Sequence, residues 1–197
     1  MKLRALIVST LGLVLVLALA ACGNKKETVV EAENEGIYVD IAGLTYQVQV
    51  SRELNPRDIE DQAYLKGLPP GTPPLKPTES WFAVFVKVWN EGDEPAQAAQ
   101  EFRVVDTQYR DGQPCEPSKG CFAPVDLDTS INQFAYASTQ VDPGEQYPPP
   151  SSTAYEGVVA GSVLIFRIPY ASYDNRPLEL LFKSSSSATE GGVRLDI

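Results

Sequence analysis

The chain has 197 residues with 16 basic and 26 acidic side chains, a net charge of −10, and no histidine. Without histidine, Ser-His-Asp and Cys-His catalysis and the commonest zinc ligands are excluded. The acidic balance argues against nucleic-acid binding, which needs basic patches. We therefore expect that the protein is not an enzyme and that it has no cofactor and no nucleic-acid partner. A hydrolase that works without histidine is a further alternative, but the sequence offers no candidate catalytic residues for it.

Residues 1–21 read MKLRALIVSTLGLVLVLALAA, in which two early basic residues precede an uncharged run of 17 residues. This layout is typical of an export signal that is removed from the mature chain. A transmembrane helix is the alternative, but the run is at the short limit for spanning. It also lacks the aromatic belt usual at a membrane interface. We predict a signal peptide over 1–21, which leaves 14 basic and 26 acidic side chains, or −12.

Leu19-Ala20-Ala21-Cys22 resembles the bacterial lipobox, the signal for lipoprotein processing. This resemblance implies that Cys22 receives a diacylglyceryl group and becomes the first mature residue. The alternative is an ordinary secretory signal with an incidental cysteine. Two acyl chains, such as palmitate, anchor a protein stably where one would not. We expect localisation at the cell membrane on the extracytoplasmic face, held by lipid because an acidic body is repelled by anionic headgroups.

Residues 22–35 are mostly polar, and we predict a lipid-anchored tether there, about 40 Å long when extended. A single domain is expected over 36–197. It begins with residues 37–41 and 44–50, whose apolar and polar side chains alternate as in half-buried strands.

Residues 52–80 differ from the strands around them. Asn55-Pro56 reads as a helix start and Gly67 as a stop, so the pattern predicts a short helix over 56–66. LPPGTPPLKP follows and should be extended and stiff. A Pro-rich recognition motif is one interpretation, but the readers of such motifs act inside cells, which favours a plain connector.

WFAVFVKVWN, residues 81–90, is the strongest predicted strand and is apolar on both faces. One face carries Trp81, Phe85 and Trp89. Aromatic side chains of this kind anchor interfaces when they are exposed, so this face is the candidate binding site. The alternative is that the 56–66 helix and the Pro-rich segment cover it as a second small core.

Cys115 and Cys121, in CEPSKGC, are the remaining cysteines. Export places them in an oxidising compartment, where an even number of thiols favours a disulfide. Two thiolates without histidine are a poor zinc set, and the spacing is wider than that of the usual redox motif. We predict a structural disulfide.

Further strands are predicted over 102–106, 122–128, 178–183 and 193–197, and within 154–170, where residues 163–168 alternate; Pro/Gly-rich turns separate them. About eight strands with one short helix indicate an all-β, immunoglobulin-like antiparallel sandwich, with 52–80 inserted into it. Oxygen ligands cluster at Asp126, Asp128 and Asn132, and at Glu91, Asp93 and Glu94. No loop has calcium-binding spacing, so we nominate no metal site and keep a cation-binding module as an alternative.

The order FAVFVKVWNEGDEP, FRVVDTQYRDG, VDPGE, EGVVAGSVLIFRIP, PLELLF and VRLDI resembles telokin-like immunoglobulin domains of bacterial lipoproteins. That family is related to a secreted immunoprotective mycobacterial antigen. The resemblance covers roughly residues 80–197 and, more loosely, 36–51; residues 52–80 and CEPSKGC depart from it. SRELNPRDIEDQAYLKG with PPGTPPLKP is similar to uncharacterised actinobacterial lipoproteins. The family implies a fold and a compartment and brings no catalytic residues.

These observations together favour a membrane-anchored, non-catalytic binding module with a cell-envelope protein as a partner. A structural envelope protein without a ligand is the alternative.

Overall fold

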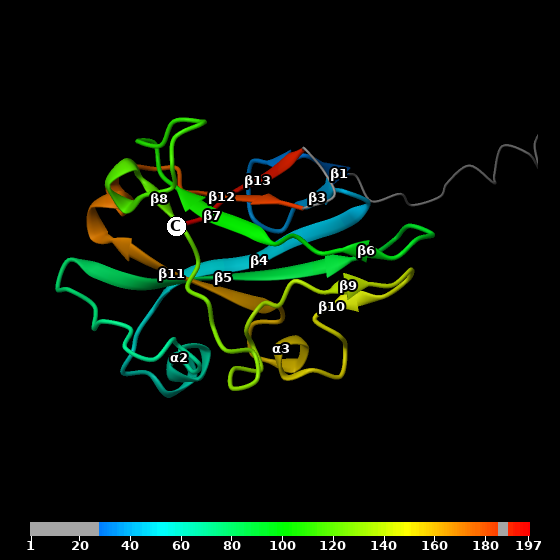
Figure 1. Cartoon of the computed structure of the whole chain (residues 1–197), viewed down its shortest axis with the longest axis horizontal. Coiled ribbons are helices and arrows are strands. Elements are labelled where there is room, and N and C mark those ends of the chain that lie inside the picture. The colour runs from blue at the N-terminus through cyan, green and yellow to red at the C-terminus, as the bar shows by residue number, and fades with distance from the viewer. Residues whose placement is uncertain (1–27, 185–188) are drawn as a thin grey trace, which may run out of the picture.

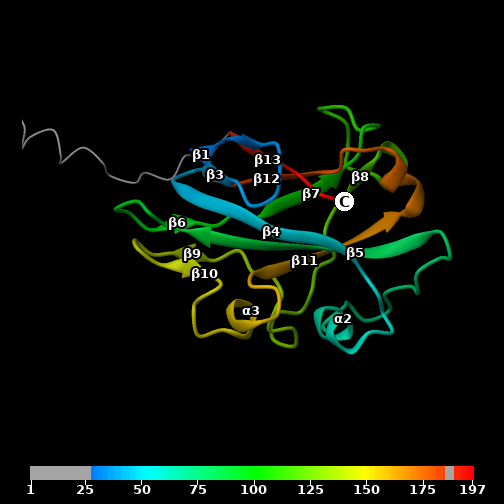
Figure 2. The same cartoon turned by 180° about the vertical axis from the view of Figure 1, so that it is seen from behind.

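Two β-sheets face each other across the main core, and short helices cover the far side of one of them (Figures 1 and 2). The computed structural model describes residues 28–184 and 189–197. The signal peptide, Cys22 and the start of the tether lie outside the described residues, so their assignments stay predictions. Within the described residues, no helix has the length and apolar character needed to cross a membrane.

The first sheet has six strands in the order β1-β3-β4-β5-β10, with β11 also paired to β5. Its strands are β1 (Thr28–Val29), β3 (Tyr38–Ile41), β4 (Leu44–Leu54), β5 (Glu79–Trp89), β10 (Gln146–Tyr147) and β11 (Ser162–Pro169). β5 is central, with β4 along one edge and β11 along the other, both antiparallel. The prediction of a central strand is therefore confirmed, and of its two alternatives the structure shows the one in which both faces are covered, since one face lies in the main core and the other largely in a second core.

The second sheet has five strands in the order β2-β13-β12-β7-β8, and a two-stranded sheet joins β6 to β9. These strands are β2 (Glu31–Ala32), β6 (Ala96–Gln97), β7 (Glu101–Val105), β8 (Cys121–Phe122), β9 (Gln140–Val141), β12 (Glu179–Lys183) and β13 (Glu190–Arg194). Aromatic rings fill the space between the main sheets, and Phe182 contacts both Tyr46 and Phe102. The all-β sandwich expected from the strand pattern is present.

A third layer covers the other face of the first sheet. It consists of α2 (Ile59–Tyr64), α3 (Thr153–Glu156) and the connection 124–138, which passes between them (Figures 1 and 2). Two 3-10 helices, η1 (Pro117–Lys119) and η2 (Tyr170–Asp174), lie in other loops. A second, smaller core fills the space under this layer, made of Leu54, Tyr64, Trp81, Ala83, Phe85, Leu127, Ala135, Val163 and Ile165.

The predicted helix is shorter than expected and starts later. Asp58 is its N-cap, because the Asp58 side chain accepts hydrogen bonds from the amides of Glu60 and Asp61. Asn55 instead closes the preceding turn, where its side chain accepts the Arg57 amide. The prediction of a start at Asn55-Pro56 was therefore wrong, since the better-placed carboxylate lies three residues further on.

The prediction of a free tether up to residue 35 was wrong for its second half. β1 pairs in parallel with β3, and β2 pairs in parallel with β13, so residues 28–32 connect the edges of the two sheets. Ala32 is buried in the main core, and the Glu35 carboxylate accepts the amides of Ser51 and Asp196. Through these contacts, residues 28–35 become part of the folded domain, although their sequence is too polar to predict a strand.

Two other predicted strands have different bounds, and a third lies inside its predicted range. The strand over 122–128 ends at Phe122, because the chain crosses from there to β11, where Pro124 bridges Phe166. The strand predicted within 154–170 is β11, Ser162–Pro169, and it follows the unpredicted α3. The last strand lies earlier than 193–197, since 190–194 pairs with β12 while the Leu195 amide bonds to Leu178.

Candidate functional site

The predicted aromatic binding face is largely covered. Trp81 and Phe85 are 6% and 0% exposed and belong to the second core, under Tyr64 of α2 and the Pro-rich segment. Trp89 is half-buried, with its ring 5.7 Å from that of Tyr38 and its indole N–H donated to Gln146. The three side chains therefore do not form an exposed strip. Residues 52–80 cover the face of β5 that carries Trp81 and Phe85.

Two residues of the first cluster of oxygen ligands, Asp128 and Asn132, have structural roles. Asp128 accepts the Ser130 amide and hydroxyl, and Asn132 donates to the carbonyls of Tyr64 and Lys66. The Ser130 bonds lower the pKa of the Asp128 carboxyl. The Asn132 bonds hold the connection 124–138 against the end of α2. Glu91, Asp93 and Glu94 are exposed on a turn. No three acidic or cysteine side chains among the described residues lie close enough together to hold a metal ion.

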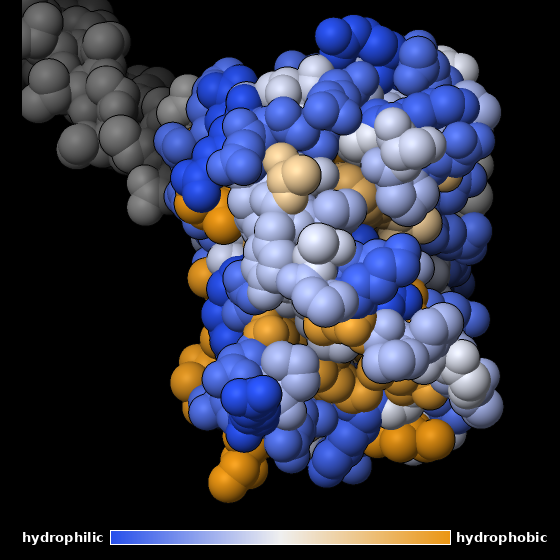
Figure 3. All heavy atoms as spheres, turned by 90° about the vertical axis from the view of Figure 1, so that its left-hand side faces the viewer, coloured by the Kyte–Doolittle hydropathy of each residue, from blue (hydrophilic) through white to orange (hydrophobic). Residues whose placement is uncertain are grey.

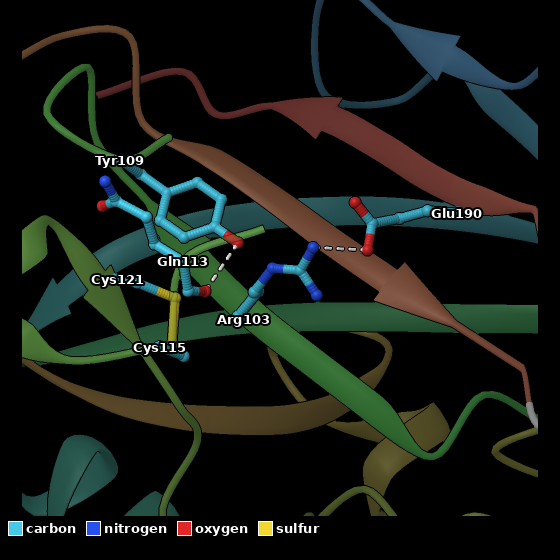
Figure 4. The surroundings of a disulfide bond; sticks show 6 residues. All are labelled: Arg103, Tyr109, Gln113, Cys115, Cys121 and Glu190. Atoms are coloured by element: carbon cyan, nitrogen blue, oxygen red, sulfur yellow. Dashed lines mark hydrogen bonds and ion pairs between the residues drawn. A yellow bond between two sulfur atoms is a disulfide. The ribbon is translucent and has the colours of Figure 1, made fainter. Parts of the chain in front are cut away.

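The predicted disulfide between Cys115 and Cys121 is present (Figure 4). Cys121 is buried in β8, whereas Cys115 lies in the exposed loop 107–120. The Tyr109 hydroxyl bonds to the Gln113 carbonyl in the same loop, and the Arg103 guanidinium lies 5.7 Å from the Tyr109 ring. The disulfide thus fixes a loop that stands beside the outer face of the second sheet.

A groove runs across this outer face, and we call it the second-sheet groove. One part is a hollow of about 160 Å³ around Gly192, and the other is a cavity of about 380 Å³ beside the loop 107–111. The two parts share Glu31, Glu179, Leu181 and Glu190. Leu181 and Val105 lie on the floor, since both alternate with core residues along their strands. The groove therefore combines an apolar floor with charged walls.

Two neighbouring glycines of β13 explain the hollow. A side chain at Gly191 would meet Ile41 and Phe182 at 2.8 Å, so it points into the core and has no room. A side chain at Gly192 would point outward, where its Cβ would lie 3.4 Å from Leu181 and 3.6 Å from Glu31. These are ordinary contacts, so the missing side chain of Gly192 leaves space above Leu181.

The walls of the groove are mainly acidic, with six acidic and two basic lining residues. Arg194 pairs with Glu33 and lies 3.8 Å from Glu179, and Arg103 pairs with Glu190 at 2.5 Å (Figure 4). Glu31 lies opposite Gly192 in the register and has no ion pair within the described part of the chain. Glu31 is thus an exposed carboxylate at the junction of the two parts, without an ion-pair partner among the residues that the structure describes.

The connection 124–138 borders a second pair of hollows, of about 310 and 500 Å³. The first lies where the two sheets part, next to Phe102 and Tyr136. Tyr136 is packed against Phe102 and donates to the Ala99 carbonyl, and burial raises the pKa of its hydroxyl well above the usual value. The aromatic side chains that line the first hollow are thus engaged in packing, so this hollow is a weaker candidate site than the second-sheet groove.

Exposed aliphatic side chains gather on the helical layer. Ile59, Ile131 and Val158 are 86%, 59% and 82% exposed, on α2, on the connection and just after α3. In Figure 3, hydrophobic residues are concentrated in the lower half of the molecule, on the side of the helices, whereas the upper half is mostly hydrophilic. The hollow beside Ile131 has polar lining residues, but Asp128 there is already hydrogen-bonded to Ser130, so we take the second-sheet groove as the better candidate.

Sequence reasoning missed the groove. Its central residue, Glu31, fell in the predicted tether, and nothing local relates Glu31 to Gly192. One signal was available, because the alternation over 178–183 puts Leu181 on the otherwise polar face of its strand.

No protein-family model matches this sequence, and no curated protein matches it. Among solved structures, the chain is similar to yjhA from Bacillus subtilis, with 14% identity, a TM-score of 0.50, and coverage of 83% of this chain and 99% of that one. It is also similar to ycdA from Bacillus subtilis, provisionally named a lipoprotein, with 11% identity, a TM-score of 0.48 and 81% of this chain covered. This chain spans only 38% of ycdA.

An uncharacterised β-sandwich protein from Clostridium difficile 630 matches with 12% identity, a TM-score of 0.41, and coverage of 88% of this chain and 99% of that one. At these identities, the similarity to yjhA supports the fold alone.

Proposed function

We propose that this protein is a lipid-anchored, extracytoplasmic and non-catalytic binding module that holds a cell-envelope protein in the second-sheet groove. The observation that carries the proposal is the groove itself: Leu181 and Val105 form an apolar floor between charged walls. Binding sites combine such a floor with a few polar groups that fix orientation. No nucleic-acid partner is proposed, because the lining is acidic.

The anchor supports a role close to the bilayer. The first described strand begins at Thr28, six residues after the predicted lipidated cysteine, Cys22. Six residues span about 20 Å when fully extended. Glu31 in the groove wall follows Thr28 by three positions, so a bound partner would be held near the membrane surface.

The binding role can be tested by photo-crosslinking in cells that carry the full chain. A photoreactive amino acid replaces Leu181 in the groove, and a matched control replaces Glu156, which is exposed on α3. We expect a discrete protein adduct from position 181 and none of the same mass from position 156. Identical patterns from both positions, or no adduct from either, would count against the groove and favour a structural envelope protein without a ligand.

Anchoring can be tested independently of binding. The Cys22→Ser variant should lose incorporation of a labelled fatty acid and should leave the membrane fraction. Mass spectrometry of the purified wild-type protein should find a modified Cys22 at the N-terminus. An unmodified thiol, or a retained leader, would contradict the lipid anchor without affecting the groove.

A further inference from the structure

We infer that the hollow above Gly192 receives an arginine or lysine side chain from an extended segment of the partner. This inference rests on the proposed binding function and specifies the chemistry of the ligand. It follows from the acidic charge of the groove walls and from the shape of the hollow.

The charge of the groove favours a cation. The six acidic lining residues outnumber the two arginines, and Arg103, which lies beside the groove, is already paired with Glu190. Asp106 is also occupied, because its carboxylate accepts the Gln108 amide and the Asn175 side chain. Glu31 is left without an ion pair among the described residues, and it lies at the point that both parts of the groove share.

The shape of the hollow suits a long side chain with a charged end. Leu181 provides an apolar surface on which the methylene groups of arginine or lysine can lie while the cationic group stays among carboxylates. Because Gly192 has no side chain, this end can come close to Glu31, which is its cross-strand neighbour. A guanidinium or ammonium group there would form charge-assisted hydrogen bonds with that carboxylate.

Other ligand classes fit the groove less well. A neutral apolar segment would displace water from Glu31 without replacing its hydrogen bonds, which costs free energy. An acidic segment would be repelled by the same walls. The groove therefore discriminates by charge as well as by shape.

The direct test uses two fluorescent peptides that differ in one atom group. The first is Gly-Leu-Arg-Leu-Gly, and the second carries citrulline, which has nearly the same shape as arginine but no charge. Fluorescence anisotropy measures their binding to the full mature chain in detergent micelles. We expect the arginine peptide to bind about tenfold more tightly, and this difference to shrink as salt is added.

Two variants of the protein locate the site. Glu31→Gln removes the proposed carboxylate and should weaken binding of the arginine peptide about tenfold, close to the citrulline level. Gly192→Val places a side chain in the hollow from a position where its Cβ makes only ordinary contacts with Leu181 and Glu31, and it should abolish binding of both peptides. Glu156→Gln removes the same charge on α3, far along the chain from the groove residues, and should change nothing. Melting temperatures and circular dichroism confirm that each variant is folded.

Equal binding of the two peptides, or unchanged binding by the folded Gly192→Val variant, would overturn the inference. The outcome is separable from that of the proposed function. If crosslinking at position 181 captures a partner while the arginine peptide fails to bind, the groove is a binding site with a different ligand chemistry. If neither experiment detects binding, the proposed function fails with the inference.

Discussion

The guanidinium of Arg52 lies 2.5 Å from the carboxylate of Asp61 and thereby joins β4 to the short helix α2. Asp61 is only 6% exposed at its side chain and also accepts the Asn55 amide at 2.7 Å. The same guanidinium lies 5.9 Å from the ring of Tyr64, which packs on Phe85. This ion pair therefore fastens the cover over the aromatic face of β5.

Replacing Asp61 with asparagine should destabilise the domain. The charge-assisted hydrogen bonds to Arg52 would be lost, at a cost of about 2 kcal/mol in the free energy of unfolding at neutral pH. Burial by itself would raise the pKa of Asp61, but its hydrogen bonds with Arg52 and Asn55 and the charge of Arg52 lower it below the usual value. Urea unfolding at several pH values measures the effect.

The pH dependence of this difference has a definite sign. A carboxyl whose pKa is lower in the folded state contributes stability above its unfolded pKa of about 4, and this contribution is lost as the pH falls through the folded pKa. The gap between wild type and Asp61→Asn should therefore narrow in acid. A gap of constant size down to strongly acidic pH would show that Asp61 acts through packing alone.

The two glycines of β13 should respond oppositely to alanine. Gly191→Ala forces a methyl group against Ile41 and Phe182 and should destabilise the protein by about 2 kcal/mol. Gly192→Ala points outward without a clash and should be neutral, or stabilising by about 0.5 kcal/mol, because the unfolded chain loses freedom. Thermal melts of both variants test the assignment of faces, and equal destabilisation by the two would contradict it.

The disulfide should make a modest contribution to stability. Replacing both Cys115 and Cys121 with alanine opens a short loop and should cost about 2 kcal/mol. Hydrogen exchange should increase mainly over residues 107–120, because the second core and the remaining sheet contacts do not depend on the loop. Reduction of the wild-type protein serves as the control, and an unchanged melting temperature on reduction would count against this role.

The two tryptophans should differ in acrylamide quenching. Trp89→Phe leaves Trp81, which is 6% exposed, and its emission should resist the quencher. Trp81→Phe leaves the half-buried Trp89, which should be quenched more strongly. If Trp81 were quenched as readily as Trp89, residues 52–80 would not cover the aromatic face in solution.

Sequence patterns alone were sufficient for features that depend on neighbours along the chain. Alternation over 44–50 and the two apolar faces of 81–90 predicted β4 and the central β5, because a strand places successive side chains on opposite faces. The number of cysteines and the predicted export together predicted the Cys115–Cys121 disulfide. The apolar leader followed by Cys22 predicts a lipid anchor, which lies outside the described residues.

Only the tertiary structure decided what depends on residues far apart in the chain. It places α2 over Trp81 and Phe85, so that an apparent binding face becomes a core. It also brings Glu31, near the start of the domain, beside Gly192, near its end, and so creates a groove. Local propensity carries no information about such pairings, because the free energy that selects them comes from burial and cross-strand contacts that exist only once the sheets have formed.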